Sequence, residues 1–355
     1  MKNLLIIGPF PPLYSYGGPT KSIKNIYDIF STSNLTFSIL SPNFHLNGKK
    51  IFYHNNLKNV FFKKNQLIFL ITNFYKFKVI WLNSFFDKKL LLLILIRIFY
   101  SYKIIVSPRG QLSNEAIKTS NPFLKKLFIN LLKVFRHFII FHSTSDHETK
   151  CIKNFFKKIN VKQISNVFNL EYIPNNIKEK KFVFYSRIHK KKGLDILLET
   201  VYKYNIDIQL DIYGFIEDYG YWKICKNYID KLSKVNYKGI LEDGDIKKIS
   251  NKYSFFILPT LNENFGHVIV ELLSIGCIPI ISKNSNPFDK EISSIFNLNF
   301  DVDNKASLRD IINYINNIDK NVLINFKSKV KPYFLKLKED QEKTKKMYID
   351  FILEI

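Results

Sequence analysis

A chain of 355 residues is longer than one ordinary α/β domain and suits two, each with its own core. Hydrophobic residues make up 46% of the chain and charged residues 24%, which are ordinary globular values, so the chain should fold as a soluble body. Lys and Arg number 54 against 30 Asp and Glu, and the formal net charge of +24 implies attraction to something anionic.

The charge alone leaves nucleic acid, a membrane surface and phosphorylated ligands open as partners. Lysines occur in every segment beside many Asn, Ile, Phe and Tyr residues, so a biased genome composition explains them equally well. The three cysteines, Cys151, Cys225 and Cys277, show no CxxC spacing. Neither a zinc site nor a disulfide framework is therefore indicated, and a reducing cytoplasm fits best.

Two apolar segments bear on location. The run within residues 1–9 is too short for a signal peptide and is typical of a buried first strand, so secretion is not expected. Residues 90–96, flanked by Lys88, Lys89 and Arg97, fall well short of the roughly 20 apolar residues that a spanning helix needs. We expect a buried helix there.

Short apolar runs alternate with amphipathic stretches in the first half, which predicts a parallel sheet covered on both faces. The runs are residues 4–7, 37–40, 79–82, 104–107 and 138–141. A helix between the first two runs has an apolar face formed by Ile23, Ile26, Ile29 and Phe30. Thr20 or Ser22 is available as its N-cap.

The same pattern starts again after residue 180, so two sheets are expected. Strands are predicted at 182–186, 208–213, 255–258 and 278–282, with a helix at 194–204. Residues 166–181 break the periodicity and read as a linker. We expect α/β architecture with two Rossmann-like domains facing across a cleft, residues 1–168 and 169–338, and an amphipathic C-terminal helix, 339–355, packed back on the first domain.

Two groups of residues are placed where an activated, phosphorylated ligand would bind. Gly17 and Gly18 precede the first long helix, whose N-terminal amides attract anions, although such a pair is more often only a tight turn. Arg187 and Lys192 follow the first strand of the second domain. Ligands bind beyond the carboxyl ends of strands in open α/β sheets, so both cations are expected to hold a diphosphate; a solvated basic loop is the alternative.

Glu263 and Glu271 bracket a glycine turn between a strand and a helix. This stretch resembles the Glu-x7-Glu signature of the retaining GT-B glycosyltransferases of family 4, and the segment with Arg187 and Lys192 is similar to that family's phosphate-binding loop. Residues 107–112 and 142–148 resemble stretches in members that build bacterial surface polysaccharides. The similarity runs from about residue 8 to 290.

The resemblance implies a role for each matching residue. Glu271 would bind the donor ribose and Glu263 the transferring sugar, while Arg187 and Lys192 stabilise the leaving diphosphate. The remaining donor-binding positions that it implies are Ser186, Gly214, Gly239, Ile240, Asn264, Phe265, Gly266 and His267.

The chain also departs from the family pattern. Many relatives carry a histidine where this chain has Arg109, which is expected to take over a charge-stabilising role or to mark a different handling of the acceptor. Leu272 replaces an alanine, and residues 286–288 read Asn-Pro-Phe where Pro-Trp is expected. These changes affect packing and sugar choice rather than reaction class.

No cofactor or metal is expected. Asp301 and Asp303 match an Asp-x-Asp metal signature but lie near the end of the second domain, so we read the match as chance. His142 and His147, near Asp146 and Glu148, look like a metal cluster only superficially, and a loop with a helix start is the preferred interpretation.

By resemblance, the expected function is transfer of a hexose-type sugar, with retention of configuration, from a nucleotide sugar, preferably UDP-linked, to a lipid-linked saccharide. The pathway would be cell-surface polysaccharide synthesis: O-antigen, capsule or lipopolysaccharide. The protein is expected in the cytoplasm, peripheral at the inner membrane face, and the residues proposed to rest on anionic lipid are Phe123, Lys125, Lys126, Phe128 and Arg136. The alternative is a basic nucleic-acid-binding protein, for which no recognisable motif exists.

Overall fold

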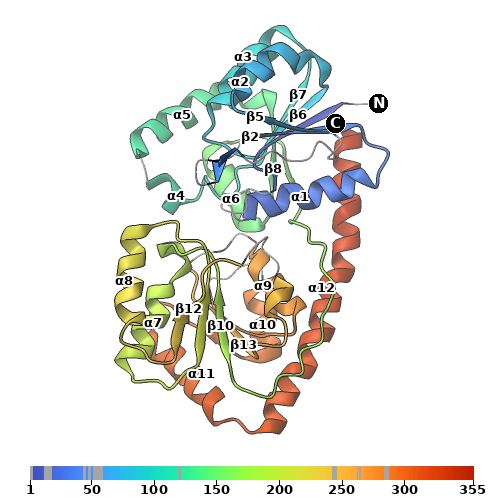
Figure 1. Ribbon diagram of the computed structural model, residues 1–355. Coiled ribbons are helices and arrows are strands. Elements are labelled where there is room, and N and C mark those ends of the chain that lie inside the picture. The colour runs from blue at the N-terminus through green and yellow to red at the C-terminus, as the bar shows by residue number, and fades with distance from the viewer. Residues whose placement is uncertain are drawn as a thin grey trace. The chain divides into compact units, whose positions relative to one another are not determined.

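The computed structural model describes residues 3–11, 18–42, 45–46, 49–50, 59–118, 121–241, 246–261, 263, 265–283 and 288–355. The chain divides into two compact units. The first unit comprises Met1–Val167 and Glu342–Ile355, and the second comprises Phe168–Gln341. Each unit contains a parallel sheet flanked by helices (Figure 1), so the predicted pair of Rossmann-like folds is confirmed.

The sheet of the first unit has seven strands within the described residues, in the order β5-β2-β1-β6-β7-β8-β9. These are β1 (Leu4–Ile7), β2 (Phe37–Pro42), β5 (Val60–Lys63), β6 (Val79–Leu82), β7 (Lys103–Val106), β8 (Ile139–Ser143) and β9 (Val161–Gln163). Two further strands, β3 (His45–Leu46) and β4 (Lys49–Lys50), pair antiparallel with each other. The strand order reverses direction between β1 and β6, which makes that point the expected ligand-binding crevice of this sheet.

Successive residues of β1 enter two different cores, because neighbouring side chains of a strand point to opposite faces. Leu5 and Ile7 pack in the core under α2, α3 and α5, whereas Leu4 and Ile6 pack in the core under α1 and the end of α12. The helices of this unit are α1 (Gly18–Ser31), α2 (Gln66–Asn73), α3 (Lys88–Phe99), α4 (Asn114–Lys118), α5 (Pro122–Val134) and α6 (Asp146–Phe155). The apolar strands are therefore covered on both faces.

The second unit has a six-stranded sheet in the order β12-β11-β10-β13-β14-β15, counted over its described residues. Its strands are β10 (Phe182–Tyr185), β11 (Leu210–Tyr213), β12 (Val235–Tyr237), β13 (Phe255–Leu258), β14 (Ile278–Ser282) and β15 (Asn299–Phe300). Its helices are α7 (Leu194–Lys203), α8 (Tyr219–Ile229), α9 (His267–Ser274), α10 (Asp289–Phe296), α11 (Lys305–Asn317) and most of α12 (Lys320–Glu354). The reversal of strand order falls between β10 and β13.

The last turns of α12 belong to the first unit. Tyr348, Phe351 and Ile352 are buried in the core that contains Trp81, and the ring of Tyr348 stacks on that indole with centroids 6.0 Å apart. An apolar face at helical spacing is thus buried against the sheet, as amphipathic helices require.

Two local predictions were wrong. The first helix begins at Gly18, so Thr20 and Ser22 are buried inside it and neither is its N-cap; Pro19 suits the first turn because its missing N–H has no helical partner there. The helix at 90–96 is only half buried. Leu90 and Leu93 lie in the core, but later residues of α3 are exposed, because a helix packed against a sheet buries one face.

Gly193 joins two loops of the second unit. Its φ of +68° lies in the left-handed region, and a Cβ at this position would lie 1.9 Å from the carbonyl oxygen of Pro259. Leu261 N–H donates to the carbonyl of Lys191 at 2.9 Å beside this contact. The loops after β10 and β13 are therefore in direct backbone contact, which only glycine permits here.

Replacing Gly193 by Ala should destabilise the protein more than replacing Gly239, whose φ of +84° is equally left-handed but whose Cβ would meet nothing within 4 Å. Gly239→Ala should cost about 1–2 kcal/mol of backbone strain, and Gly193→Ala that strain plus displacement of the Pro259 backbone. Chemical denaturation of both variants measures the difference. Equal losses would contradict the close approach of the two loops.

Candidate active site

The second unit brings its predicted cations and one predicted carboxylate together at the carboxyl edge of its sheet. Arg187 and Lys192 follow β10, and Glu263 follows β13, so all three lie at the reversal of strand order. His189 accepts a hydrogen bond from the N–H of Lys191 and so caps the single 3₁₀ turn Lys190–Lys192. This turn directs the Lys192 side chain inward, where the residue is 9% exposed.

Lys192 and Glu263 form a buried ion pair through Nζ and Oε2. Burial raises the pKa of Glu263, but the positive charges of Lys192, Lys191 and Arg187 outweigh it and hold that pKa below its ordinary value. Glu263 is therefore ionised at neutral pH. Two buried charges are tolerated because each compensates the other, and removing one would leave the other uncompensated.

Arg187 lies within electrostatic reach of Glu263 and is also paired with a residue that sequence reasoning missed. Its Nη1 is 2.8 Å from each carboxylate oxygen of Glu217, in the loop after β11, and both side chains are about one-third exposed. The backbones of the two loops bridge at Ile188 and Ile216. The sequence signal that could have identified Glu217 is its position as an acidic residue in the loop after β11, the strand next to β10.

The second glutamate of the pair lies in a helix rather than in the loop. Gly266 has a φ of +76° and precedes α9, which begins at His267 and contains Glu271. A Cβ on Gly266 would lie 3.2 Å from Cγ of Glu263, so the turn passes close to that carboxylate. Glu271 is 8% exposed and the side chain of Glu263 is 16% exposed, so both glutamates are largely buried.

The other predicted donor-binding positions of this unit lie at the neighbouring strand ends. Ser186 directly follows β10, and its N–H donates a hydrogen bond to the backbone carbonyl of Tyr213. Gly214 and Gly239 follow β11 and β12 and are joined by an N–H···O bond of 2.9 Å. Ile240 is exposed and Phe265 is buried. Their roles in binding stay predictions, as do those of His267 and Glu271.

In the first unit, Gly18 begins α1 and Arg109 follows β7. Arg109 has a left-handed φ of +54° and is half-buried. Gly17, Asn264, Asn286 and Pro287 lie outside the described residues.

His142 was wrongly assigned to a loop: it lies in β8 and is wholly buried. Its Nδ1 is 2.7 Å from Oγ of Ser107, which also accepts a hydrogen bond from Trp81, and its Nε2 lies 3.2 Å from the carbonyl of Ile164. Burial lowers the pKa of His142 well below 6.5, and the charge of Arg109 lowers it further. A neutral core histidine fits these contacts.

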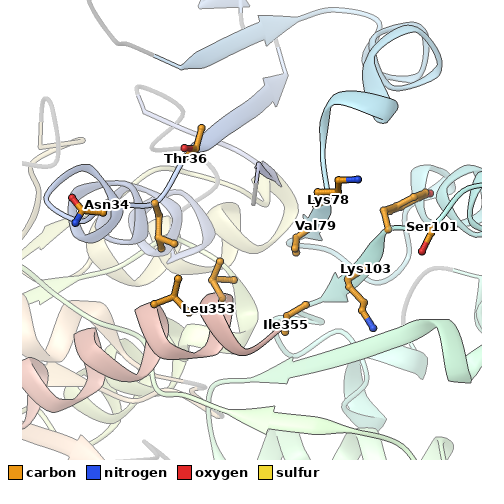
Figure 2. A pocket seen from close by; sticks show the side chains of 11 residues that line it. Asn34, Thr36, Lys78, Val79, Ser101, Lys103, Leu353 and Ile355 are labelled. Carbon is orange, nitrogen blue, oxygen red and sulfur yellow. The ribbon is translucent and has the colours of Figure 1, made fainter. Parts of the chain in front are cut away.

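A pocket of about 700 Å³ lies at the amino edge of the first sheet, where β2, β6 and β7 begin. It is lined by the residues that begin β6 and β7, among them Lys78 and Lys103, and by Leu353 and Ile355 at the end of the chain (Figure 2). None of the predicted site residues lines it. Ligands of such sheets bind at the carboxyl edge, so this pocket is not the active site.

Comparisons with known proteins agree with this geometry. Residues 170–322 match the family model of glycosyl transferases group 1. Sucrose-phosphate synthase from Thermosynechococcus elongatus superposes with a TM-score of 0.74, 13% identity and complete coverage of both chains. HepE from Anabaena, solved with UDP and glucose, gives 0.75, 15% and complete coverage of both. WaaG, a glycosyltransferase involved in lipopolysaccharide biosynthesis, gives 0.61 and 10%, covering 93% of this chain and 95% of that one. No curated protein matches by sequence.

The matched domain spans nearly all of the second unit, including the Lys192–Glu263 pair. The protein is a glycosyltransferase with the GT-B fold. Among the described residues, no helix is both long and apolar enough to cross a bilayer. The expectation that no metal takes part stays a prediction.

The pKa of His142 has a consequence for stability. Below pH 6.5 His142 binds a proton in the unfolded chain but stays neutral in the folded chain. The free energy of unfolding should therefore fall as pH decreases from about 7 to 5. His142→Gln, which cannot titrate, should show a shallower fall. Thermal unfolding midpoints measured across this range test the claim, and parallel profiles for the two proteins would contradict it.

Proposed function

We propose that the protein is a retaining glycosyltransferase of family 4 that transfers a hexose-type sugar from a UDP-linked donor to a saccharide acceptor. The observation that carries the proposal is the Lys192–Glu263 ion pair at the reversal of strand order, with Arg187 beside it. An ammonium and a guanidinium match a leaving diphosphate, and a carboxylate accepts hydrogen bonds from sugar hydroxyls. The UDP and glucose in the HepE structure support the choice of donor.

Each side chain then has a separate task. Lys192 and Arg187 stabilise the charge that grows on the diphosphate as the bond to the sugar breaks. Glu263, ionised because those cations hold down its pKa, orients the transferring sugar. The acceptor hydroxyl attacks the face from which the diphosphate departs and gives its proton to that diphosphate, so configuration is retained.

Lys192→Ala should lower turnover about 100- to 1,000-fold, because the charge on the leaving group loses its buried counter-ion. Lys190 lies in the same 3₁₀ turn but is exposed, so Lys190→Ala is the matched control and should retain near-normal rates. Initial rates with a panel of nucleotide sugars measure both variants. Comparable rates for the two would refute the assignment of Lys192.

The same proteins distinguish the two functional classes. UDP should raise the thermal unfolding midpoint of the wild type and of Lys190→Ala, whereas an oligonucleotide at moderate salt should not. The opposite result would support a nucleic-acid-binding protein. NMR of the product glycoside reports the anomeric configuration, and inversion would overturn the family 4 assignment.

The acceptor that we propose is a lipid-linked saccharide of a cell-surface polysaccharide, met at the inner face of the membrane. The helices α2, α3 and α5 cover the same face of the first sheet (Figure 1). Support for this acceptor comes from the outer faces of these helices, which point away from the sheet. We call these faces the apolar-basic surface. Its exposed apolar residues are Ile68, Ile71, Leu95, Ile98, Phe99, Phe123, Leu124, Leu127, Leu131 and Val134.

The charge of this surface favours an anionic lipid partner. The three helices carry six Lys or Arg residues and no acidic residue. Phe99 and Phe123 are 80% and 77% exposed, an arrangement of aromatic and basic side chains that suits a membrane interface. Phe128, expected on this surface, instead packs inward against Phe85.

Replacing Phe99 and Phe123 together by Ser should weaken binding to vesicles that contain anionic lipid by tenfold or more, since each ring loses its burial among the acyl chains. Flotation with anionic and with zwitterionic vesicles measures this. Ile324→Ser is the control, because Ile324 is 60% exposed in the second unit. Equal flotation of the double variant and the control would argue against a membrane role.

A further inference from the structure

Three polar side chains converge at the carboxyl edge of the first sheet. Asn83 follows β6, Arg109 follows β7 and Asn166 follows β9, although they are far apart in sequence. Asn83 lies at the reversal of strand order between β1 and β6, and a Cβ on Gly8, just after β1, would lie 3.2 Å from its Cβ. We call these three side chains the Arg109 cluster. It occupies the place where such sheets bind ligands.

Neutral amides hold the guanidinium of Arg109. Its Nε and Nη2 donate to Oδ1 of Asn83 at 3.2 and 2.7 Å, and its Nη1 donates to Oδ1 of Asn166 at 2.7 Å. Asn83 and Asn166 are 5% and 6% exposed. Two buried partners gripping three different nitrogens fix the plane of the guanidinium, so its remaining N–H groups have a set direction.

The backbone beneath Arg109 is held in place as well. One carboxylate oxygen of Glu148 accepts the N–H of Gly110 at 2.7 Å, and the other accepts the N–H and the hydroxyl of Thr144. Glu148 is 2% exposed, and both of its carboxylate oxygens accept hydrogen bonds from these donors. These hydrogen bonds stabilise the left-handed φ of Arg109. A strained backbone of this kind is found more often at functional sites.

The cluster has unused capacity for an anion. Among the residues that the structure describes, no carboxylate forms an ion pair with Arg109. Oδ1 of Asn83 must face Arg109, because a guanidinium only donates, so Nδ2 is left as a donor. This Nδ2 is buried with no hydrogen-bond partner in the described structure. A buried donor without an acceptor costs about 1–3 kcal/mol, which a ligand oxygen would recover.

We propose that the Arg109 cluster binds an oxyanion carried by the acceptor, so that Arg109 and Asn83 select acceptors bearing a phosphate or a carboxylate. The planar guanidinium suits either group through paired N–H donors, and Asn83 Nδ2 adds a third. The group has two possible sources: the phosphate that links a saccharide to its lipid, or an acidic sugar of the saccharide. The inference rests on the proposed function, because it concerns the acceptor of that reaction.

The test uses the full chain saturated with UDP, which occupies the donor-side cations. Inorganic pyrophosphate stands for a lipid-linked phosphate and glucuronate for an acidic sugar, and each is titrated by calorimetry. Arg109→Gln removes the guanidinium, and Asn83→Asp gives Arg109 an internal carboxylate of the same shape. Both should weaken binding of one anion about 10- to 100-fold, the loss expected for charge-assisted hydrogen bonds. Lys153→Gln, which removes an exposed cation of the same unit, should change nothing.

The outcomes separate the inference from the function on which it rests. Loss of pyrophosphate binding assigns the cluster to the lipid-linked phosphate, and loss of glucuronate binding assigns it to an acidic sugar. UDP affinity measured on each variant shows that it is folded, and it should equal that of the wild type. Unchanged binding of both anions, or loss of UDP affinity in Arg109→Gln, would overturn the inference alone. Failure of the wild type to bind UDP would overturn the proposed function.

Discussion

The geometry of the candidate active site depends on one contact, the backbone of Gly193 against the carbonyl of Pro259. The neighbouring hydrogen bond from Leu261 to Lys191 ties the same two loops. With these loops joined, Lys192 and Glu263 meet although 71 residues separate them. A side chain at position 193 would push the loops apart, and both charges would then be buried without compensation.

Burial and pairing divide the labour among the cations at this edge. Lys192 is buried and matched to Glu263, whereas Arg187 is one-third exposed and shares Glu217 in a setting where solvent screens the pair. A diphosphate could replace Glu217 at Arg187 at little cost, but it could reach Lys192 only alongside Glu263. The cations would then hold the phosphate and Glu263 the adjacent sugar. The phosphate and the sugar are covalently linked in the donor, so the groups that bind them must be neighbours.

The first unit uses positive charge differently. Arg109 is held by amides rather than by a carboxylate, so its charge stays available, and that charge together with burial keeps His142 neutral. Two helices of the same unit, α3 and α5, expose apolar and basic side chains and contain no acidic residue. The positive charges of the chain therefore differ in their surroundings, because Arg109 is hydrogen-bonded to neutral amides whereas Arg187 and Lys192 are paired with carboxylates.

The sequence by itself determined the class of fold and of reaction. Fully apolar runs such as residues 182–184 and 255–258 are buried whatever the details, because only a doubly covered parallel sheet hides them. The spacing of Glu263 and Glu271 and the cations after β10 could be read directly, since those residues are local to one motif. Caps and exposure were harder: Thr20 and Ser22, α3 and His142 were misjudged because packing against the sheet overrides local preference. Only the tertiary structure decided that Glu217 pairs with Arg187 and that Asn83 and Asn166 hold Arg109. Those partners lie 26 to 57 residues away, and no periodicity records which strand ends become neighbours.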